Sequence, residues 1–545
     1  MLTTPFPNIE RDPGKEDANP GIQLFGQRLF SSQSAAELLV ELLLVATSAK
    51  RIGDDLSMPA TQLLPELGEL SEWPTAAPLR YAPRSRLNLK LFSFLGVSNL
   101  DTRHASHREH YRDLLDRLRG QIDTRGGLCA DEVMRTLGNL FLGFQGTGAN
   151  RTWCAQAFLP VCRELIAGET MWNDSVARKS GVEGWKKVCE AYRKYFSESK
   201  HIFLARGGEL LYLQLCNVLR RADHELAEWN DHAGTGLSPD ECTAAGLHRL
   251  LSSGFERVLG ACPEALGNLA RFIDTGVETE TRDASDGSEG SRRWTACGWC
   301  PEESWREGFL FAVELSRICS AAMDPIDRLE VLSTACAIQE LRSLCAQSAR
   351  YAPARNSEAS PLGYVWTFSD PAGDLVVPKE VSRRCLKAVE RMISEAIRHP
   401  EIKEEVDKQS KKGDPYKQAD THYGHKLFLT VSKRLGLVIP RRGRGARFVL
   451  NGKLLRFLVL ALVPPQERLS YQTFKDLAFA HFGMAFDDDR ISRACAWCGQ
   501  PRLGTLGEQV DEWLQEMLDA AGVLQRLSDS CALVHNPFER EEGEN

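Results

Sequence analysis

Apolar side chains recur with a helical period over most of the 545-residue chain. In the segment 34–49, leucines stand three and four positions apart, which places them on one face of a helix, while Glu37 and Glu41 fall at its edge. We therefore expect a mainly α protein with a multi-domain helical body. The same spacing predicts further helices over 109–122, 130–142, 153–166, 182–195, 207–221, 247–259, 263–273, 305–322, 325–348 and 379–397.

Two stretches break this pattern strongly. The first twenty residues combine prolines with acidic side chains and predict a flexible lead. The second stretch is residues 274–292, in which Val277 is the only large apolar side chain. Such a segment buries too little apolar surface to offset the conformational entropy lost on ordering, so we expect a linker or an exposed loop. The expected organisation is a lead at 1–20, an N-terminal helical region at 21–273 with a break near 167–181 that would divide it into two subdomains, the linker at 274–292, a middle helical region at 293–417 and a C-terminal module at 418–545.

Alternating apolar patterns predict a few strands as well. In the middle region, Tyr364–Phe368 and Asp374–Val377 flank the turn sequence Ser-Asp-Pro-Ala-Gly, which predicts a β-hairpin at 364–377. The C-terminal module begins with two short strands around a glycine-rich turn. Further elements follow in the order helices at 454–462, 471–482, 487–498 and 506–521, then strands at 523–527 and 530–534.

Helices followed by a terminal hairpin give the element order of a winged-helix-like α+β module. Ser470 is the expected N-cap of the helix at 471–482, and Gly522 suits the left-handed end of the helix before the hairpin. Such modules contact either nucleic acids or other proteins.

Charge is distributed unevenly along the chain. The net charge is −7, yet the stretch between Asp420 and Glu467 contains nine lysines and arginines and no acidic residue. A patch of this kind attracts a phosphate backbone through Coulomb attraction and counterion release. A basic face for an acidic partner protein and a merely solvated surface are the alternatives. The candidate nucleic-acid-binding residues are Lys433, Arg434, Arg441, Arg442, Arg444, Arg447, Lys453 and Arg456.

Cysteine usage indicates a reducing compartment. Sixteen cysteines are scattered through the chain, most of them singly among apolar neighbours, so they resemble small buried hydrophobic residues rather than a disulfide framework. The N-terminus lacks the basic start and apolar core of a signal peptide. No apolar stretch is long enough to cross a bilayer, so we expect a cytoplasmic protein without a membrane partner.

Two Cys-x-x-Cys pairs are candidates for metal binding. Cys297–Cys300 and Cys495–Cys498 together supply four thiols, the ligand set of a tetrahedral zinc site. The pairs are far apart in sequence, and the second falls on a predicted helix, so buried cysteines beside a core tryptophan are the favoured interpretation. A redox dithiol is a further alternative. No cofactor is predicted, and zinc remains an alternative.

His104, His107 and His110 follow one another at intervals of three. On a helix this spacing places three imidazoles along one side, where they could bind a metal. The competing interpretation is a polar helix start that contacts another part of the chain. We found no nucleophile elbow, kinase signature or Rossmann fingerprint, which favours a protein without catalytic activity.

The layout of a large helical body, a basic segment at 421–456 and a wing-like hairpin at 523–534 resembles that of accessory subunits of bacterial anti-phage defence operons. These subunits occur beside helicases in the Zorya and Druantia systems. The resemblance implies a DNA-sensing or scaffolding partner of a helicase or nuclease, and it carries no residue roles.

Three functional hypotheses follow from the sequence. The first is a non-catalytic DNA-binding or adaptor subunit of a multiprotein complex in anti-phage defence, whose partners are DNA and proteins such as a helicase or nuclease. The second is a protein–protein scaffold without nucleic-acid contact. The third is a metal-dependent hydrolase or nuclease that would use the histidine triplet or the paired cysteines.

Overall fold

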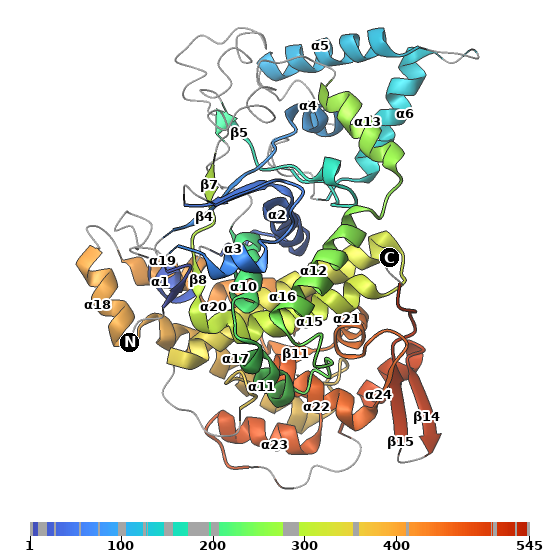
Figure 1. Cartoon of the computed structure of the whole chain (residues 1–545). Coiled ribbons are helices and arrows are strands. Elements are labelled where there is room, and N and C mark those ends of the chain that lie inside the picture. The colour runs from blue at the N-terminus through green and yellow to red at the C-terminus, as the bar shows by residue number, and fades with distance from the viewer. Residues whose placement is uncertain are drawn as a thin grey trace.

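The chain was analysed as a computed structural model, in which helices dominate and short strands form small sheets (Figure 1). The fold is therefore mainly α, as expected. The structure describes residues 4–8, 19–26, 29–53, 56–74, 77–95, 105–123, 127, 129–146, 156–172, 196–197, 206–275, 294–351, 359–409, 414–502, 504, 510–528 and 531–541.

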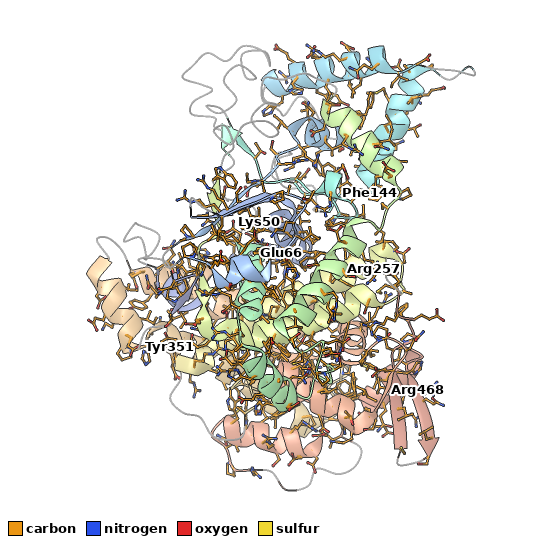
Figure 2. The ribbon with its side chains drawn as sticks, in the orientation of Figure 1. Lys50, Glu66, Phe144, Arg257, Tyr351 and Arg468 are labelled. Carbon is orange, nitrogen blue, oxygen red and sulfur yellow. The ribbon has the colours of Figure 1, made fainter. Side chains whose placement is uncertain are left out.

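Four helices form the centre of the molecule, and side chains fill the space between them (Figure 2). Along α10 every residue is buried, and α2, α15 and α16 bury most of theirs. A helix that is apolar on all sides belongs in a core, which agrees with the leucine-rich pattern of the segment 34–49. The central helices are α2 (Ala35–Thr47), α10 (Gly207–Leu219), α15 (Trp305–Ser320) and α16 (Pro325–Tyr351).

The N-terminus of α2 carries a complete capping box. The Ser34 hydroxyl accepts from the backbone N–H of Glu37, and the Glu37 carboxylate accepts from the backbone N–H of Ser34. At the other end, Lys50 is buried and donates to the carbonyls of Ala46, Ser48 and Gln62 at 2.7–2.9 Å. Burial lowers the pKa of Lys50 to about 7.

A four-stranded antiparallel sheet of order β3-β2-β4-β7 lies beside α2 and brings residues 295–296 against the N-terminal region. A second, two-stranded sheet pairs β1 with β8. The elements here are β1 (Pro5–Phe6), α1 (Pro20–Phe25), β2 (Ala49–Ile52), β3 (Leu56–Met58), α3 (Leu67–Ser71), β4 (Leu79–Ala82), β7 (Thr295–Ala296), β8 (Cys300–Pro301) and η4 (Glu302–Ser304).

One end of the molecule is built from helices that surround α4 and η1 (Figure 1). The elements of this end are α4 (Leu87–Lys90), η1 (Leu91–Leu95), α5 (Ala105–Gln121), α6 (Ala130–Gly143), η3 (Arg163–Leu165), β5 (Met171–Trp172), β6 (Phe196–Ser197) and α13 (Glu264–Thr275). Helix α12 (Ala244–Leu259), which precedes α13 in the chain, packs on α15, whereas α11 (Asp223–Ala233) lies away from this end and contacts α22 (Tyr471–Phe482) (Figure 1).

A second four-stranded sheet, of order β10-β11-β9-β13, organises the C-terminal half. Strand β9 runs parallel to both β11 and β13, and β10 is antiparallel to β11. Helix α17 follows β9 and packs on it and on α16 and α20. The elements are β9 (Trp366–Ser369), α17 (Val376–Ile397), α18 (Pro400–Gln409), α19 (Pro415–His422), α20 (His425–Leu435), β10 (Val438–Ile439), β11 (Arg447–Val449) and β13 (Met484–Ala485).

The chain ends in a three-stranded antiparallel sheet of order β12-β15-β14, at the end opposite α5 (Figure 1). Helix α22 packs against β12 and β15, and α24 packs against β14. The elements are α21 (Gly452–Leu462), β12 (Arg468–Ser470), α22 (Tyr471–Phe482), α23 (Asp488–Trp497), α24 (Glu512–Ala520), β14 (Leu524–Ser528) and β15 (Cys531–His535).

The hairpin predicted at 364–377 is wrong. Residues 366–369 do form a strand, but α17 begins at Val376, where the second strand was expected. The intervening turn is held by Asp370, which accepts from the backbone N–H groups of Asp374 and Leu375. Strand β9 finds its partners 80 and 118 positions further along the chain, at Phe448 for Phe368 and at Met484 for Trp366, which local pattern reading does not detect.

Two more local predictions are corrected. The expected flexible lead includes Pro5 and Phe6, which form β1, and Phe6 is buried beside Trp73. Residues 156–166 form no α-helix but a short 3-10 turn, so the helix predicted over 153–166 is absent from its described part. The helix predicted at 182–195 and most of the predicted linker at 274–292 lie outside the described residues.

In the described part of the chain, no helix combines the length and the apolar composition that crossing a bilayer requires.

Candidate nucleic-acid interface

The basic loop at 440–446 joins β10 to β11 and lies on the surface. Gly443 and Gly445 have φ angles of 101° and 84°, a left-handed conformation that side chains disfavour, so the glycines allow the tight path of this loop. Arg441 and Arg442 precede Gly443, and Arg444 lies between the two glycines. All three arginine side chains are exposed.

None of these three arginines forms an ion pair or hydrogen bond with any residue that the structure describes. Arginine keeps its charge at physiological pH, because the guanidinium group delocalises the positive charge over three nitrogen atoms. The loop therefore presents three concentrated positive charges that the described carboxylates leave uncompensated.

Helix α17 places a further arginine under the loop. The guanidinium of Arg383 lies so close to Gly445 that a Cβ atom there would be 2.9 Å from Nη2. The only carboxylate paired with Arg383 among the described residues is Glu380, at 3.7 Å, and Glu380 is shared with Arg384 at 3.2 Å. Arg383 and Arg384 therefore share one carboxylate partner, Glu380, on this turn of the helix.

The positive surface continues from α17 onto α20. Lys387, one turn beyond Arg383, and Lys433 of α20 both act on the half-buried Glu390. Burial raises the pKa of Glu390, and the two lysines act in the opposite direction. We call this surface the basic ridge, and define it by Arg383, Lys387, Lys433, Arg441, Arg442 and Arg444.

Two of the predicted binding residues have internal roles instead. Arg447 is buried in β11, where Nε donates to the Ser369 hydroxyl at 3.1 Å and Nη2 donates to the Pro371 carbonyl at 3.1 Å. Arg434 donates to the carbonyls of Gln33 and Ser31 at 2.7 and 2.6 Å, so it fastens α20 to the segment before α2. Neither guanidinium belongs to the basic ridge.

The last two predicted residues lie on α21 and face α16. Lys453 forms an ion pair with Glu330 at 3.0 Å, and Arg456 forms one with Asp327 at 2.7 Å. Lys453 also lines a cavity of about 440 Å³ together with Arg434 and the N-terminus of α2. The paired carboxylates compensate both charges, so this site attracts a polyanion less than the ridge does.

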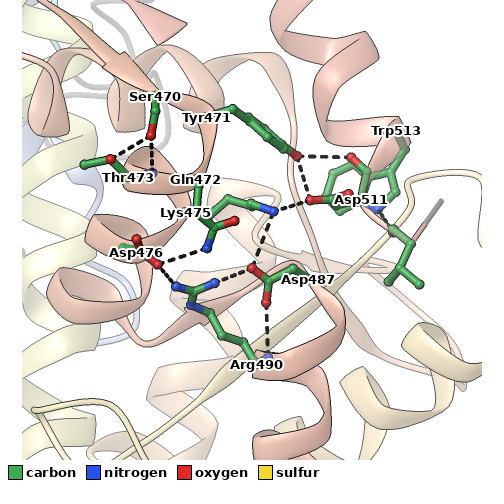
Figure 3. Close-up of polar contacts among 11 residues, drawn as sticks. Ser470, Tyr471, Gln472, Thr473, Lys475, Asp476, Asp487, Arg490, Asp511 and Trp513 are labelled. Atoms are coloured by element: carbon green, nitrogen blue, oxygen red, sulfur yellow. Dashed lines mark hydrogen bonds and ion pairs between the residues drawn. The ribbon is translucent and has the colours of Figure 1, made fainter. Parts of the chain in front are cut away.

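Lys475 of α22 is likewise compensated (Figure 3). Its ammonium group lies 2.6 Å from the carboxylate of Asp511 and 3.5 Å from that of Asp487. The same cluster contains Arg490, which bonds Asp487 and Asp476, and the hydroxyl of Tyr471, which donates to Asp511. The cations of this cluster hold α22, α23 and the start of α24 together.

The candidate metal ligands are dispersed. Cys297 and Cys300 flank the turn between β7 and β8, and both are buried. Burial raises the pKa of both thiols. Within the part of the chain that the structure describes, no group of three or more His, Cys, Asp or Glu residues is arranged to hold a metal ion.

Cys498 of the second Cys-x-x-Cys pair meets a different partner, Cys385 of α17, at a sulfur–sulfur distance of 3.5 Å. The histidine triplet is described in part: His104 lies outside the described residues, while His107 and His110 are buried on α5. The pKa of His110 is lowered, first by burial and then by the nearby His107 and Arg117. An imidazole buried in this way is a core residue of the helical end.

Sequence reasoning missed Arg383 and Lys387. The helix at 379–397 was expected, but its basic residues are interspersed with acidic ones, so its excess of positive charge is much smaller than that of the acid-free stretch between Asp420 and Glu467. The signal lies in the fold, because the β9–β11 pairing brings α17 alongside the 440–446 loop.

No family model, no curated protein and no solved structure matches this chain.

Proposed function

We propose that the chain is a non-catalytic DNA-binding or adaptor subunit of a cytoplasmic multiprotein complex, and that the basic ridge holds the phosphate backbone. The observation that carries the proposal is the cluster of three exposed arginines in the 440–446 loop without a carboxylate partner among the described residues. Guanidinium groups bind phosphate oxygens bidentately, and each contact releases counterions from the nucleic acid.

The C-terminal elements support a winged-helix interpretation of the module. The chain order is α21, β12, α22, α24, β14 and β15, and the sheet order is β12-β15-β14, with β13 and α23 inserted after α22. In winged-helix proteins the helix before the hairpin commonly enters the major groove. Here that helix is α24, and it exposes Glu512, Glu516 and Asp519.

An acidic α24 would repel phosphates, so the proposed DNA contact is the ridge and not the helix of the module. The repulsion instead favours a protein partner for α24. The neighbouring strand β14 is an edge strand, and it exposes Leu527 at 56% of its surface. An unpaired edge and an exposed apolar side chain favour association with another chain. The adaptor role rests on this surface, and the resemblance to defence subunits makes a helicase or nuclease the expected partner.

The test is DNA binding by variants of the full chain. Arg441→Ala, Arg442→Ala and Arg444→Ala combined should weaken binding to a short fluorescently labelled duplex at least tenfold at low salt, as measured by anisotropy. The control variant is Lys453→Ala with Arg456→Ala, which removes two cations that already have carboxylate partners.

The control should bind within about twofold of the wild type, since a compensated charge contributes little to attraction at a distance. Equal binding by the triple variant and the wild type would remove the proposal. So would a wild-type chain that shows no binding to DNA at low salt.

A further inference from the structure

Two cysteines that are 113 positions apart in sequence face each other between α17 and α23. The sulfur atoms of Cys385 and Cys498 are 3.5 Å apart. Cys385 lies on the buried face of α17, and Cys498 is the C-cap residue of α23. The two helices also pack on each other, and Arg384 of α17 donates to the side chain of Gln500, which follows α23, at 3.5 Å.

The surroundings of Cys385 favour its deprotonated form. Burial alone would raise the pKa of its thiol, but hydrogen bonds from Cys498 and from Thr367 outweigh burial, and the net pKa is lowered. The Thr367 hydroxyl lies 3.2 Å from the Cys385 sulfur. By contrast, burial raises the pKa of Cys216, Cys336 and several other thiols of the core.

Access to the pair is one-sided. Cys385 has no exposed surface, whereas Cys498 is partly exposed. A small oxidant that arrives from solvent therefore meets Cys498 first. Once one thiol of the pair has lost its proton to solvent, the remaining proton lies in the hydrogen bond between the two sulfurs. With that proton on Cys385, the thiolate is at Cys498.

We propose that Cys385 and Cys498 form a redox-active dithiol that a hydroperoxide converts into a disulfide between α17 and α23. The Cys498 thiolate attacks one peroxide oxygen, the O–O bond breaks, and Cys498 becomes a sulfenic acid while hydroxide leaves. Hydroxide takes the proton of Cys385 and becomes water. The Cys385 thiolate then attacks the Cys498 sulfur and displaces a second hydroxide, which is protonated from solvent.

In total the two sulfur atoms lose two electrons, and one hydrogen peroxide molecule is reduced to two water molecules. The sulfurs must approach from 3.5 Å to the S–S bond length of about 2.05 Å. We expect Cys498 and the turn after α23 to move, because Cys498 ends that helix whereas Cys385 lies inside α17.

Cys495 competes as a partner for Cys498, since it lies three positions earlier on α23. Its exposed surface is 2%, and its pKa is raised by burial and by the charge of Cys385. A protonated thiol is a poor nucleophile. The proposed disulfide therefore joins Cys498 to Cys385 and not to Cys495.

The experiment treats the folded full chain with hydrogen peroxide, alkylates the remaining thiols after denaturation, and maps disulfides by peptide mass spectrometry. We expect a peptide pair that joins Cys385 to Cys498 and that disappears on treatment with dithiothreitol. In Cys385→Ser, a sulfenic acid at Cys498 should persist and be trapped by dimedone. The control Cys531→Ser, which removes an exposed thiol on β15, should leave the disulfide unchanged.

Three results would overturn the proposal: a disulfide between Cys495 and Cys498, a Cys498 that becomes sulfinic acid while Cys385 stays reduced, or no change at either residue while Cys531 is oxidised. Mapping of the wild-type chain gives the answer without relying on how well the variants fold. The result is independent of DNA binding, so the dithiol and the proposed function can fail separately.

Discussion

Glu340 shows what burial does to a single charged residue. It lies on α16 with 1% of its surface exposed, and neither carboxylate oxygen has a hydrogen-bond partner among the described residues. Burial raises the pKa of Glu340 to about 8, and the charge of Arg434 opposes the rise only in part. The residue is therefore expected to hold a proton at neutral pH.

This shift predicts a pH dependence of stability. The unfolded carboxyl has a pKa of about 4.3, so between about pH 5 and 8 the folded state binds more protons than the unfolded state. The contribution of Glu340 to the free energy of unfolding therefore falls as the pH rises through this window. Glu340→Gln should remove this contribution and raise stability at pH 8 by a few kcal/mol, on the order of the shift at about 1.4 kcal/mol per pKa unit.

Denaturant unfolding at pH 5.5 and pH 8 measures the effect as the difference between the variant and the wild type. Glu330→Gln is the matched control, because Glu330 lies on the same helix, is exposed and pairs with Lys453. It should leave the pH dependence almost as it is in the wild type. An equal loss of stability with pH in Glu340→Gln and the wild type would contradict the assignment.

At this scale the sequence predicted the surroundings of the basic residues unevenly. The excess of positive charge at 421–456 is evident from composition, and the loop arginines are exposed as expected. Arg444 and Arg447 are only three positions apart, yet the first lies in the loop and the second is buried in a strand. Only the pairing of β11 with β9, remote in sequence, decides between these two environments.

Among the elements, α2 and α10 make an unusually close contact. A Cβ atom on Gly208 would lie 2.5 Å from the backbone nitrogen of Leu42 and 2.7 Å from the carbonyl oxygen of Leu38. The backbone N–H of Gly208 also donates to the Glu41 carboxylate at 2.7 Å. The two helices can approach in this way only because α10 begins with glycines.

Gly208→Ala should therefore destabilise the protein by about 3 kcal/mol, since overpacking forces backbone to move. Thermal unfolding monitored by circular dichroism is the measurement. Gly138→Ala on α6 is the control, because a Cβ atom there meets nothing within 4 Å, and it should stabilise by up to about 1 kcal/mol. If the two variants unfold at the same temperature, α2 and α10 accommodate the added methyl group without cost, and the prediction is wrong.

The polar cluster of α22, α23 and α24 gives a second prediction at this scale (Figure 3). Lys475→Met removes the cation from between the carboxylates of Asp511 and Asp487, and Asp511 then keeps a buried charge without its ammonium partner. Removing one partner of a buried pair costs about 3–5 kcal/mol.

The loss should appear as a lower midpoint of denaturant unfolding. Gln472→Ala, which removes an exposed hydrogen bond to Asp476 at 3.1 Å, is expected to change the midpoint little. If Lys475→Met is as stable as the wild type, then the cluster contributes specificity without stability.

Helices with a long apolar period were predicted well. The central helices and α21 and α22 begin and end within a few residues of the expected limits, and Ser470 caps α22 as expected. The pairing of short strands was predicted correctly only where the two strands are neighbours in sequence, as in β10–β11 and β14–β15. The strands that pair over long separations, β1 and β9, were assigned to a flexible lead and to a hairpin because their partners are remote.

For the whole molecule, the central fact is that β9 joins regions that the sequence assigned to separate units. It lies between β11 and β13 in one sheet, although the expected boundary at 418 falls between β9 and both partners. From beyond that boundary, Phe448 stacks on Trp366 of β9, and Phe486 packs against Phe368 with its ring tilted. The middle region and the C-terminal module therefore share a core.

This arrangement predicts that a fragment of residues 418–545 does not fold by itself, because it lacks the strand between β11 and β13. Near-ultraviolet circular dichroism should show little tertiary signal, and proteolysis should digest the fragment rapidly. A longer fragment, residues 294–545, retains β9, α15 and α16 and should resist proteolysis better. A stable, cooperatively unfolding 418–545 fragment would show that the module is independent.

If positive charge on the basic ridge binds polyanions, as we propose, DNA binding must weaken steeply as the salt concentration rises. Each phosphate contact contributes about 0.9 to the slope of log K against log salt concentration on duplex DNA. We expect a steep slope for the wild type, and a slope smaller by roughly three when Arg441, Arg442 and Arg444 are replaced together by alanine. Identical slopes for the two proteins would contradict binding by the ridge.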